Sequence, residues 1–546
     1  MMATQHTQSG SDVDVVVIGA GFSGLYATYK AKQLDLSVKA FDAGDDVGGV
    51  WNWNRYPGAR TDSLHHTYQF SFDKELLNEW AYSEIHPSQP EVLEYLHLVA
   101  DRYDLRQHYT FNTTVKSAVF NESTGRWEFE TDTGQTASAK YFLTGMGLVS
   151  DPHKPRYPGE ETFAGEIYHT SRWPQEPVDF TGKRVAVIGT GSSGVQIVPQ
   201  IAKVASELTV FQRTPNYCPG TGNRPVTAEE LQEIRENYDE VWRRVRNHPA
   251  GWPWEPTGRL TLEATEEERE RLFEEMWNRG GFSILYEAFD DLATNWEANE
   301  LACDFMRRKI RSIVKNPVVA EMLCPDYPYG AKRPPASDGY FESFNLPHVS
   351  LIDVNATPIT ALTPAGIRTS ATDVDVDIIV YATGFDAITG AFTRMDIRGR
   401  GGERLNDHWA QGPDTYLGIS VAGFPNMFMV AGPQSPFANL PPGAQQIGDW
   451  IGDLMAYMRE HDIEFMEPTR EAEVAWTAHL NEVAKMSTAG DGEAVNSWFT
   501  GANIEGKVRA FNVYFGGANN YADRCDAEAA SGYASFVRSG RLAELV

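Results

Sequence analysis

Two glycine-rich turns are the segments of this sequence whose residue types and spacing most clearly predict chemistry. They read Gly19-Ala20-Gly21-Phe22-Ser23-Gly24 and Gly189-Thr190-Gly191-Ser192-Ser193-Gly194, and both have the spacing G-x-G-x-x-G. In such a turn the first glycine allows a tight bend, the second lets the backbone approach a diphosphate, and the third lets helix and strand pack closely. Amide groups at the start of the following helix then bind the diphosphate. We therefore predict two dinucleotide sites.

The residue at the end of the next predicted strand distinguishes the two sites. After the first turn this residue is Asp42, whose carboxylate can accept hydrogen bonds from ribose hydroxyls. After the second turn it is Arg213, whose guanidinium can pair with a 2′-phosphate that a carboxylate would repel. The second site is therefore predicted to bind NADPH. The first is predicted to bind FAD, because its turn begins the chain and the aromatic segment Gly48-Gly49-Val50-Trp51 follows it.

Each turn needs a buried parallel strand before it and a helix after it. Short runs rich in β-branched residues at Val13–Ile18 and Arg184–Ile188 predict these strands. The predicted fold class is α/β, with two Rossmann-like dinucleotide-binding domains, the second inserted in the first, and a helical insertion. The predicted boundaries are 1–149 for the first part of the FAD-binding domain, 150–180 for an interdomain linker, 181–220 and 331–384 for the NADP-binding domain, 221–330 for the helical insertion, and 385–546 for the second part of the FAD-binding domain with a mobile late loop.

The composition excludes several classes of protein. The 546 residues have a formal net charge of −28, which disfavours binding to nucleic acid or to anionic membranes. The polar segment 1–14 lacks the basic start of a signal peptide, and the four cysteines have no C-x-x-C spacing. The 13 histidines show no ligand spacing, so no metal site is expected. We expect a cytoplasmic enzyme without an obligate protein partner.

Two dinucleotides in one chain imply that hydride passes from NADPH to the flavin. A disulfide reductase would need a cysteine pair beside the flavin, and no two cysteines here have suitable spacing. The residues alone leave three acceptors for the electrons: a quinone, a protein partner or dioxygen.

The segment between the two turns resembles the fingerprint of one enzyme family. It reads F-x-G-x-x-x-H-x-x-x-W-P, with Phe163, Gly165, His169, Trp173 and Pro174 at the specified positions. This pattern resembles the type I Baeyer–Villiger monooxygenases, including members that oxidise phenylacetone and cyclohexanone. The resemblance runs from about Val13 to about Tyr533. Further matching segments are Gly48–Asp62, Ala331–Pro334, Ala382–Asp386 and Trp498–Asn503.

The resemblance implies that the chain uses NADPH and dioxygen to convert small-molecule ketones into esters or lactones. In this family NADPH reduces FAD and dioxygen adds at flavin C4a. The resulting peroxyflavin attacks the ketone carbonyl to give a tetrahedral (Criegee) adduct. The implied catalytic residues are Arg333 and Asp62. An arginine keeps its charge at any working pH and can stabilise a negative oxygen, and a buried cation needs a partner.

The resemblance and the two turns together define the predicted binding residues. For FAD they are Gly19, Gly21, Ser23, Gly24, Asp42, Gly49, Val50, Trp51, Trp53, Asp62, Tyr68 and Val115. For NADP they are Arg60, Gly189, Thr190, Gly191, Ser192, Ser193, Gly194, Gln196, Arg213, Thr214, Lys332, Arg333 and Trp498. We expect His169 to be a structural residue of the linker and not a general base.

Two alternative functions stay open from the sequence. A flavin N- or S-oxygenase would use the C4a-hydroperoxide as an electrophile and would not need the Arg333–Asp62 pair. A nucleotide sensor without catalysis would bind the same dinucleotides. The loop Gln434–Pro442 is shorter than in the members that oxidise phenylacetone, and it favours aliphatic ketones, cyclic or linear, as substrates.

Overall fold

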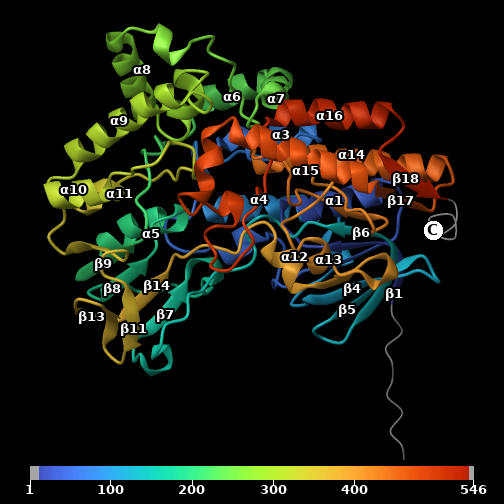
Figure 1. The fold of residues 1–546 in the computed structure, drawn as a ribbon, viewed down its shortest axis with the longest axis horizontal. Helices are drawn as coiled ribbons and strands as arrows, with labels where there is room; N and C mark the ends of the chain where they lie inside the picture. Colours follow the sequence, from blue (N-terminus) through green and yellow to red (C-terminus); the bar gives the residue numbers. More distant parts are fainter. Residues whose placement is uncertain (1–10, 540–546) are drawn as a thin grey trace, which may run out of the picture.

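The computed structural model describes residues 11–539. Residues 1–10, which form most of the segment in which we expect no signal peptide, lie outside the described residues, as do residues 540–546. Two sheets organise the chain. Figure 1 shows the first at the right and the second at the lower left, with helices from the middle of the chain above the second.

The first sheet is built around β1 (Ser11–Ile18), the strand before the first glycine turn. β1 runs parallel to β2 and β6, and the three valines at positions 15–17 are fully buried. Burial of successive residues is typical of a parallel strand with both faces covered. The other strands are β2 (Val38–Phe41), β3 (Tyr109–Thr110), β4 (Val115–Asn121), β5 (Arg126–Thr131), β6 (Thr136–Thr144), β15 (Asp396–Arg398) and β16 (Met427–Met429).

The chain leaves this first sheet and later returns to it. β4 and β5 form an antiparallel pair. β15 then pairs with β4, and β16 with β6, although both strands follow the whole second sheet in the chain. The predicted insertion of one dinucleotide-binding unit in the other is therefore confirmed.

The second sheet has five parallel strands in the order β10-β9-β8-β14-β7. They are β7 (Glu166–His169), β8 (Arg184–Ile188), β9 (Glu207–Gln212), β10 (Val349–Asp353) and β14 (Ile378–Tyr381). β7 lies in the segment 150–180, where the sequence indicates a linker, and it pairs with β14 at the edge of the sheet. Two small antiparallel sheets consist of β11 (Ile359–Thr363), β12 (Gly366–Thr369) and β13 (Asp373–Asp375), and of β17 (Phe465–Pro468) and β18 (Phe536–Ser539).

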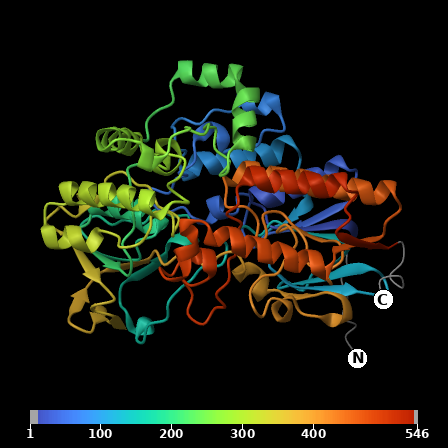
Figure 2. The ribbon, with the colours of Figure 1, turned by 45° about the horizontal axis from the view of Figure 1, so that its top comes forward.

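Helices α1 (Phe22–Gln33) and α5 (Ser192–Ala202) follow the two glycine turns, as predicted. Figure 2 shows the helices of the C-terminal part, α14 to α16, over the first sheet. The insertion between β9 and β10 is helical, as predicted. The remaining helices are α2 (Val50–Trp53), α3 (Lys74–Glu79), α4 (Gln89–Arg102), α6 (Ala228–Glu236), α7 (Tyr238–Asn247), α8 (Glu266–Arg279), α9 (Trp296–Ile313), α10 (Pro317–Leu323), α11 (Tyr340–Ser343), α12 (Gly390–Arg394), α13 (Leu405–His408), α14 (Leu440–Glu460), α15 (Arg470–Lys485) and α16 (Ala518–Ala530).

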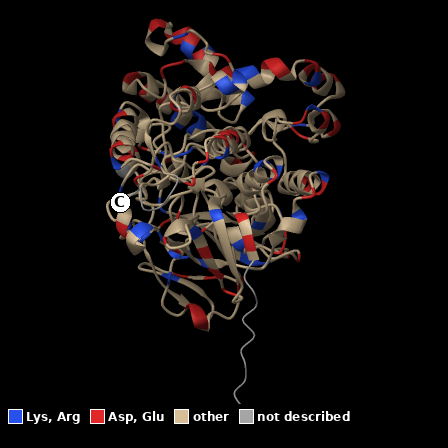
Figure 3. Cartoon of the chain, turned by 90° about the vertical axis from the view of Figure 1, so that its right-hand side faces the viewer, with Lys and Arg blue, Asp and Glu red and all other residues tan. Residues whose placement is uncertain are grey.

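Charged residues are spread over the peripheral helices and also occur on strands in the lower part of the view (Figure 3). No helix within residues 11–539 is long and apolar enough to cross a lipid bilayer. Over the same range, His, Cys, Asp and Glu side chains form no group of three placed to hold a metal ion.

Candidate active site

A cavity of about 850 Å³ is lined by both glycine turns. Parallel strands end at the same edge of a sheet, and dinucleotides bind in the crevice outside these ends. Every residue predicted to bind FAD or NADP lines the cavity except Gly24 and Gly194. These two glycines are the third of their turns, where the expected role is close packing of helix on strand. The structure therefore brings the two sets of predicted binding residues together around one space.

The first turn has the backbone that a dinucleotide diphosphate requires. Gly19 has a φ of +108°, and a Cβ there would lie 2.3 Å from the carbonyl oxygen of Gly145. A Cβ on Gly24 would lie 1.7 Å from the carbonyl oxygen of Gly19, and one on Gly49 would lie 2.8 Å from the Cα of Gly21. Close backbone contacts therefore leave no room for a side chain at these positions, and Gly19, Gly21 and Gly49 line the cavity at the start of α1. These residues fit the diphosphate of FAD.

Asp42 follows β2 and lines the cavity, as predicted, but its carboxylate also holds the turn. Oδ2 accepts a hydrogen bond from the Ala20 amide at 2.6 Å, and Oδ1 accepts one from the Gly44 amide at 2.6 Å. Burial raises the pKa of Asp42, and the two amide hydrogen bonds oppose this rise. From the sequence we expect only a ribose contact for Asp42. Its contact with the glycine turn depends on how β2 packs on β1, which the spacing does not reveal.

Aromatic residues beside the first turn are held by contacts with one another. Trp51 Nε1 donates to the Tyr68 hydroxyl at 3.1 Å, and the two rings lie edge to face with centroids 5.6 Å apart. The Arg172 guanidinium lies 4.3 Å from the centroid of the Trp53 ring. Arg172 is not among the residues predicted from the sequence, since such a contact has no signal in the spacing. These contacts orient the aromatic side chains predicted to meet the flavin.

The second turn repeats the geometry of the first. Gly189 has a φ of +112°, and a Cβ on Gly194 would lie 2.2 Å from the Gly189 carbonyl oxygen. Thr190 Oγ1 donates to the Thr214 carbonyl at 2.8 Å, which ties the turn to the residues after β9. The two fingerprints therefore share their backbone conformation as well as their spacing.

Arg213 and Lys332 place two positive charges at the same cavity. Within residues 11–539, neither forms a salt bridge with a carboxylate. Burial, with the charge of Arg213, lowers the pKa of Lys332 to about 8. Two cations that repel each other and lack an acidic partner suit a bound dianion such as a 2′-phosphate.

Arg333 and Asp62 form an ion pair across the cavity, although 271 residues separate them in the chain. Arg333 Nη1 also donates to Ser192 Oγ at 2.9 Å, and the guanidinium lies 5.7 Å from the centroid of the Phe282 ring. The side chains of Arg333 and Asp62 are 25% and 13% exposed. The predicted catalytic pair is therefore in contact, next to the second glycine turn.

Other predicted NADP residues have neighbours that hold them in place. Arg60 pairs with Glu84 at 3.0 Å, and Gln196 Nε2 donates to the Arg60 carbonyl at 3.1 Å. Trp498 begins a short 3₁₀-helix, Trp498–Thr500, and its ring packs 6.2 Å from that of Phe437. The late loop thus reaches the cavity at Trp498.

The five fingerprint residues of segment 163–174 do not line the cavity. His169, at the end of β7, accepts from the Ser171 amide at 3.1 Å through Nδ1, and its Nε2 lies 3.2 Å from the His153 carbonyl oxygen. Burial lowers the pKa of His169, so the neutral ring is favoured. A Cβ on Gly165 would lie 2.2 Å from the Asp377 carbonyl oxygen, beside β14. These features agree with a structural role for the fingerprint.

An apolar wall of the cavity comes from residues that are not among those predicted from the sequence. Trp252 and Phe282 belong to the helical insertion, with ring centroids 5.5 Å apart, and Phe437 precedes α14. The aromatic density of Gly251-Trp252-Pro253-Trp254 was the available signal. The other members of this apolar wall are Ala250, Tyr286, Ala438, Asn439 and Leu440.

Residues 12–218 match a family model described as flavin-binding monooxygenase-like. The whole chain is 45% identical to a Baeyer–Villiger monooxygenase of Pseudooceanicola batsensis, and the alignment covers 99% of that relative. The chain belongs to the Baeyer–Villiger monooxygenase family. The predicted family is thereby confirmed.

Two further comparisons bear on this Baeyer–Villiger monooxygenase. A crystal structure of cyclohexanone monooxygenase from Rhodococcus sp. Phi1 bound to NADP+ matches with a TM-score of 0.95 and 42% identity, covering 97% of this chain and 100% of that one. A phenazine N-monooxygenase of Lysobacter antibioticus is 42% identical over 96% of both chains. The predicted fold class and the cofactors FAD and NADP are confirmed, and the enzyme is an FAD-containing monooxygenase with NADPH as donor.

Proposed function

We propose that this enzyme oxidises neutral, apolar ketones, aliphatic and cyclic or linear, whose carbonyl group lies against Arg333. The position of Arg333 supports this proposal most directly. Its guanidinium contacts Ser192 of the second turn and Phe282 of the apolar wall. A ketone packed on that wall would place its oxygen beside a permanent cation. The wall residues have no charged side chain, which favours a neutral substrate.

Bound FAD and NADPH supply the electrons and the position at which dioxygen is activated. Arg333 would stabilise the negative charge that develops on the ketone oxygen as the new oxygen atom enters. A fixed donor of this kind is usually the largest single contribution to such a reaction. Asp62 would orient Arg333 and balance its charge, because a largely buried cation without a partner is costly.

We also propose that Arg213, Thr214 and Lys332 bind the 2′-phosphate of NADPH, and that the other predicted residues bind FAD and NADP as assigned from the sequence. The charges of Arg213 and Lys332, which have no carboxylate partner within the described part of the chain, support this assignment. Arginine can make two parallel hydrogen bonds to a phosphate, whereas lysine adds a compact charge.

The affinity for NADPH is expected to weaken as the pH rises through about 8. The pKa of Lys332 is lowered to about 8 by burial and by Arg213, and a bound phosphate favours the charged amine. Below pH 8 the free enzyme already holds this proton. Above pH 8 binding must take up a proton, so the Kd rises by up to about tenfold per pH unit. Titration of NADPH in the absence of air into the protein whose FAD is already reduced, over a pH series on both sides of 8, measures this.

NADH is the matched control for this pH series, because it lacks the 2′-phosphate. Its weaker binding should show no inflection near pH 8. Lys332→Arg should remove the inflection for NADPH, since arginine stays charged. The same slope for NADH and NADPH would contradict the proposed role of Lys332.

The proposed substrate class is tested with cyclic, linear aliphatic and aryl ketones supplied with NADPH and air. The expected products are esters or lactones one oxygen atom heavier than the ketone, identified by mass spectrometry. A phenazine belongs in the same panel because of the N-monooxygenase relative. Formation of an N-oxide without any ketone product would overturn the proposal. Oxidation at nitrogen generates no carbonyl oxyanion, so it would leave the Arg333–Asp62 pair unexplained.

We further propose a cytoplasmic enzyme that needs no protein partner and binds neither nucleic acid nor membranes. The formal net charge of −28 supports the absence of binding to nucleic acid and membranes, because it repels polyanions and anionic lipids. Cell fractionation, and full ketone oxidation by the purified chain alone, are the expected results that test it.

A further inference from the structure

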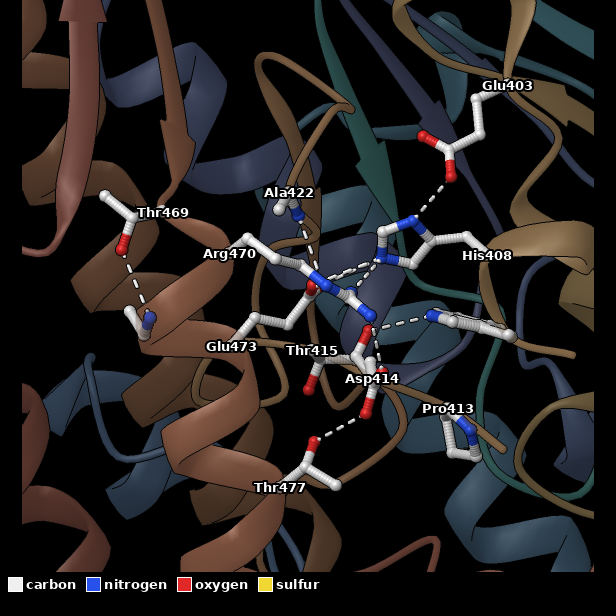
Figure 4. Close-up of polar contacts among 12 residues, drawn as sticks. Glu403, His408, Pro413, Asp414, Thr415, Ala422, Thr469, Arg470, Glu473 and Thr477 are labelled. Atoms are coloured by element: carbon white, nitrogen blue, oxygen red, sulfur yellow. Dashed lines mark hydrogen bonds and ion pairs between the residues drawn. The ribbon is translucent and has the colours of Figure 1, made fainter. Parts of the chain in front are cut away.

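A cluster of charged residues joins α13 to α15 outside the cavity. It consists of Glu403, His408, Asp414, Arg470 and Glu473, and Figure 4 shows their contacts. His408 Nδ1 lies 3.0 Å from Glu403 Oε1, and its Nε2 lies 3.1 Å from Glu473 Oε2. Arg470 pairs with Glu473 and, at 3.0 Å, with Asp414. The side chain of Glu473 is fully buried and that of His408 is 7% exposed, whereas Glu403 and Arg470 are about half exposed, so the charge cluster extends from the interior to the surface.

The nitrogen-bearing side chains of the charge cluster are those of His408 and Arg470. They face three carboxylates, and Arg470 Nη1 also lies 2.7 Å from His408 Nε2. Burial opposes the charged imidazole, but the carboxylates of Glu473 and Glu403 outweigh burial and raise the pKa of His408. The Ala422 amide donates to Glu473 at 3.1 Å, and the neighbouring pair Arg400–Glu467 borders the same region. A buried carboxylate with this many partners is fixed in position.

Thr477 connects this charge cluster to Gln434. It lies one helical turn after Glu473 on α15, so both side chains are on the same face. Thr477 Oγ1 donates to Asp414 Oδ1 at 2.9 Å, and Gln434 Nε2 donates to Thr477 Oγ1 at 3.1 Å. The hydroxyl is therefore the bridge between the charged residues and a buried amide.

Gln434 uses its whole side-chain amide in hydrogen bonds. It is 1% exposed, and its Nε2 also donates to the Pro413 carbonyl at 2.6 Å. Its Oε1 accepts from the Thr415 amide at 3.2 Å and from Thr415 Oγ1 at 2.8 Å. Gln434 has a φ of +69°, a left-handed conformation that residues other than glycine rarely adopt. The amide contacts hold the backbone in this conformation, which would otherwise be unfavourable.

The backbone of Gln434 starts the loop that carries part of the apolar wall. Its amide donates to the Asn512 carbonyl at 2.7 Å, and the Phe437 amide donates to the Tyr514 carbonyl at 2.9 Å. Residues 437–440 of this loop line the cavity. The position of these wall residues therefore depends on how Gln434 is held.

We propose that Thr477 is a positioning residue for ketone oxidation, which fixes the apolar wall at 437–440 through Gln434. The charge cluster thereby influences which ketones fit and on which side of the carbonyl the oxygen atom enters. This inference rests on the proposed function, since it needs a ketone bound against that wall. Thr477 does not line the cavity, so it acts through Gln434. A link that only stabilised the fold would change the melting temperature without changing selectivity.

The experiment compares Thr477→Val with Thr477→Ser in the FAD-loaded enzyme. Valine keeps the β-branched shape and removes the hydroxyl, whereas serine keeps the hydroxyl. For a 2-substituted cyclohexanone, Thr477→Val is expected to lower kcat/KM about tenfold, chiefly through KM, because two hydrogen bonds to the bridge are lost. The ratio of the two regioisomeric lactones should change with it. Thr477→Ser should stay within about twofold of the wild type.

Reduction of FAD by NADPH without ketone is the control reaction, and it should be unchanged in both variants. An unchanged KM and isomer ratio in Thr477→Val would overturn the inference. Equal impairment of both variants, or an equal loss in FAD reduction, would overturn it as well. Asp414→Asn offers a second test if Thr477→Val does not fold, because it removes the pair with Arg470 and keeps an acceptor for Thr477. It should shift the isomer ratio in the same direction, and an unchanged ratio would count against the charge cluster.

The proposed function and the positioning role of Thr477 can be refuted separately. A wild-type enzyme that oxidises no ketone would overturn the proposed function, and this inference with it. A wild-type enzyme that forms lactones, with a Thr477→Val variant of identical selectivity, would overturn the positioning role alone.

Discussion

Arg333→Ala is expected to lower ester formation by about 10³-fold while FAD is still reduced at saturating NADPH. Arg333 is the cation that lies between Ser192 of the second turn and Phe282 of the apolar wall. Without it, the developing negative charge on the ketone oxygen faces an apolar wall and a carboxylate at Asp62. Oxygen should still be consumed and released as hydrogen peroxide. The ester formed, the NADPH oxidised and the hydrogen peroxide released are measured on the same sample.

Two variants show whether the charge or the geometry of Arg333 matters. Arg333→Lys keeps a cation but loses the planar fork that reaches Ser192 and Asp62 together, so partial activity is expected. Asp62→Asn keeps a hydrogen-bonding partner but leaves the charge of Arg333 unbalanced, and should also be intermediate. Full ester formation by Arg333→Ala would refute the proposed mechanism.

The two dinucleotide sites could be predicted because their chemistry is local. A left-handed bend at Gly19 and a close backbone approach at Gly24 both require glycine within one short turn. The same holds for Gly189 and Gly194, so spacing along the chain is enough to identify each site. The partner of the diphosphate is the backbone of the same turn, and no distant contact has to be known.

The pairing of Arg333 with Asp62, in contrast, could not be predicted from spacing along the chain. Nothing in the spacing of these residues places them together, and their pairing was expected from the family resemblance alone. The structure shows the contact. The apolar wall could not be predicted, because Trp252 and Phe437 meet at the cavity only after the helical insertion and the C-terminal part have packed.

The strand β7 and the contacts of Gln434 are further features that the sequence does not indicate. β7 is a four-residue strand at the edge of a sheet, and its partner β14 lies more than 200 residues later. Gln434 has its unusual backbone conformation because of contacts to Pro413, Thr415 and Thr477. Both depend on tertiary packing, which overrides local preference.

Gly24→Ala is expected to yield protein with at least about tenfold less bound FAD, because the added methyl group meets backbone and not a flexible side chain. A Cβ at this position would lie 1.7 Å from the Gly19 carbonyl oxygen, and the backbone of Gly24 is itself so close to Gly145 that a Cβ on Gly145 would lie 2.4 Å from the Gly24 nitrogen. Helix α1 must therefore move away from the turn. Its first amides then lose their alignment with the diphosphate of FAD. The ratio of flavin to protein absorbance after purification measures the bound fraction.

Two glycines serve as matched controls for Gly24→Ala. Gly443→Ala in α14 adds the same methyl group where no atom lies within 4 Å, so FAD content should be unchanged. Gly194→Ala adds it 2.2 Å from the Gly189 carbonyl oxygen, in the second turn. That variant should keep its FAD and lose affinity for NADPH, since only the second helix is displaced. If Gly24→Ala retained FAD while Gly194→Ala lost it, the assignment of the two dinucleotides to the two turns would have to be exchanged.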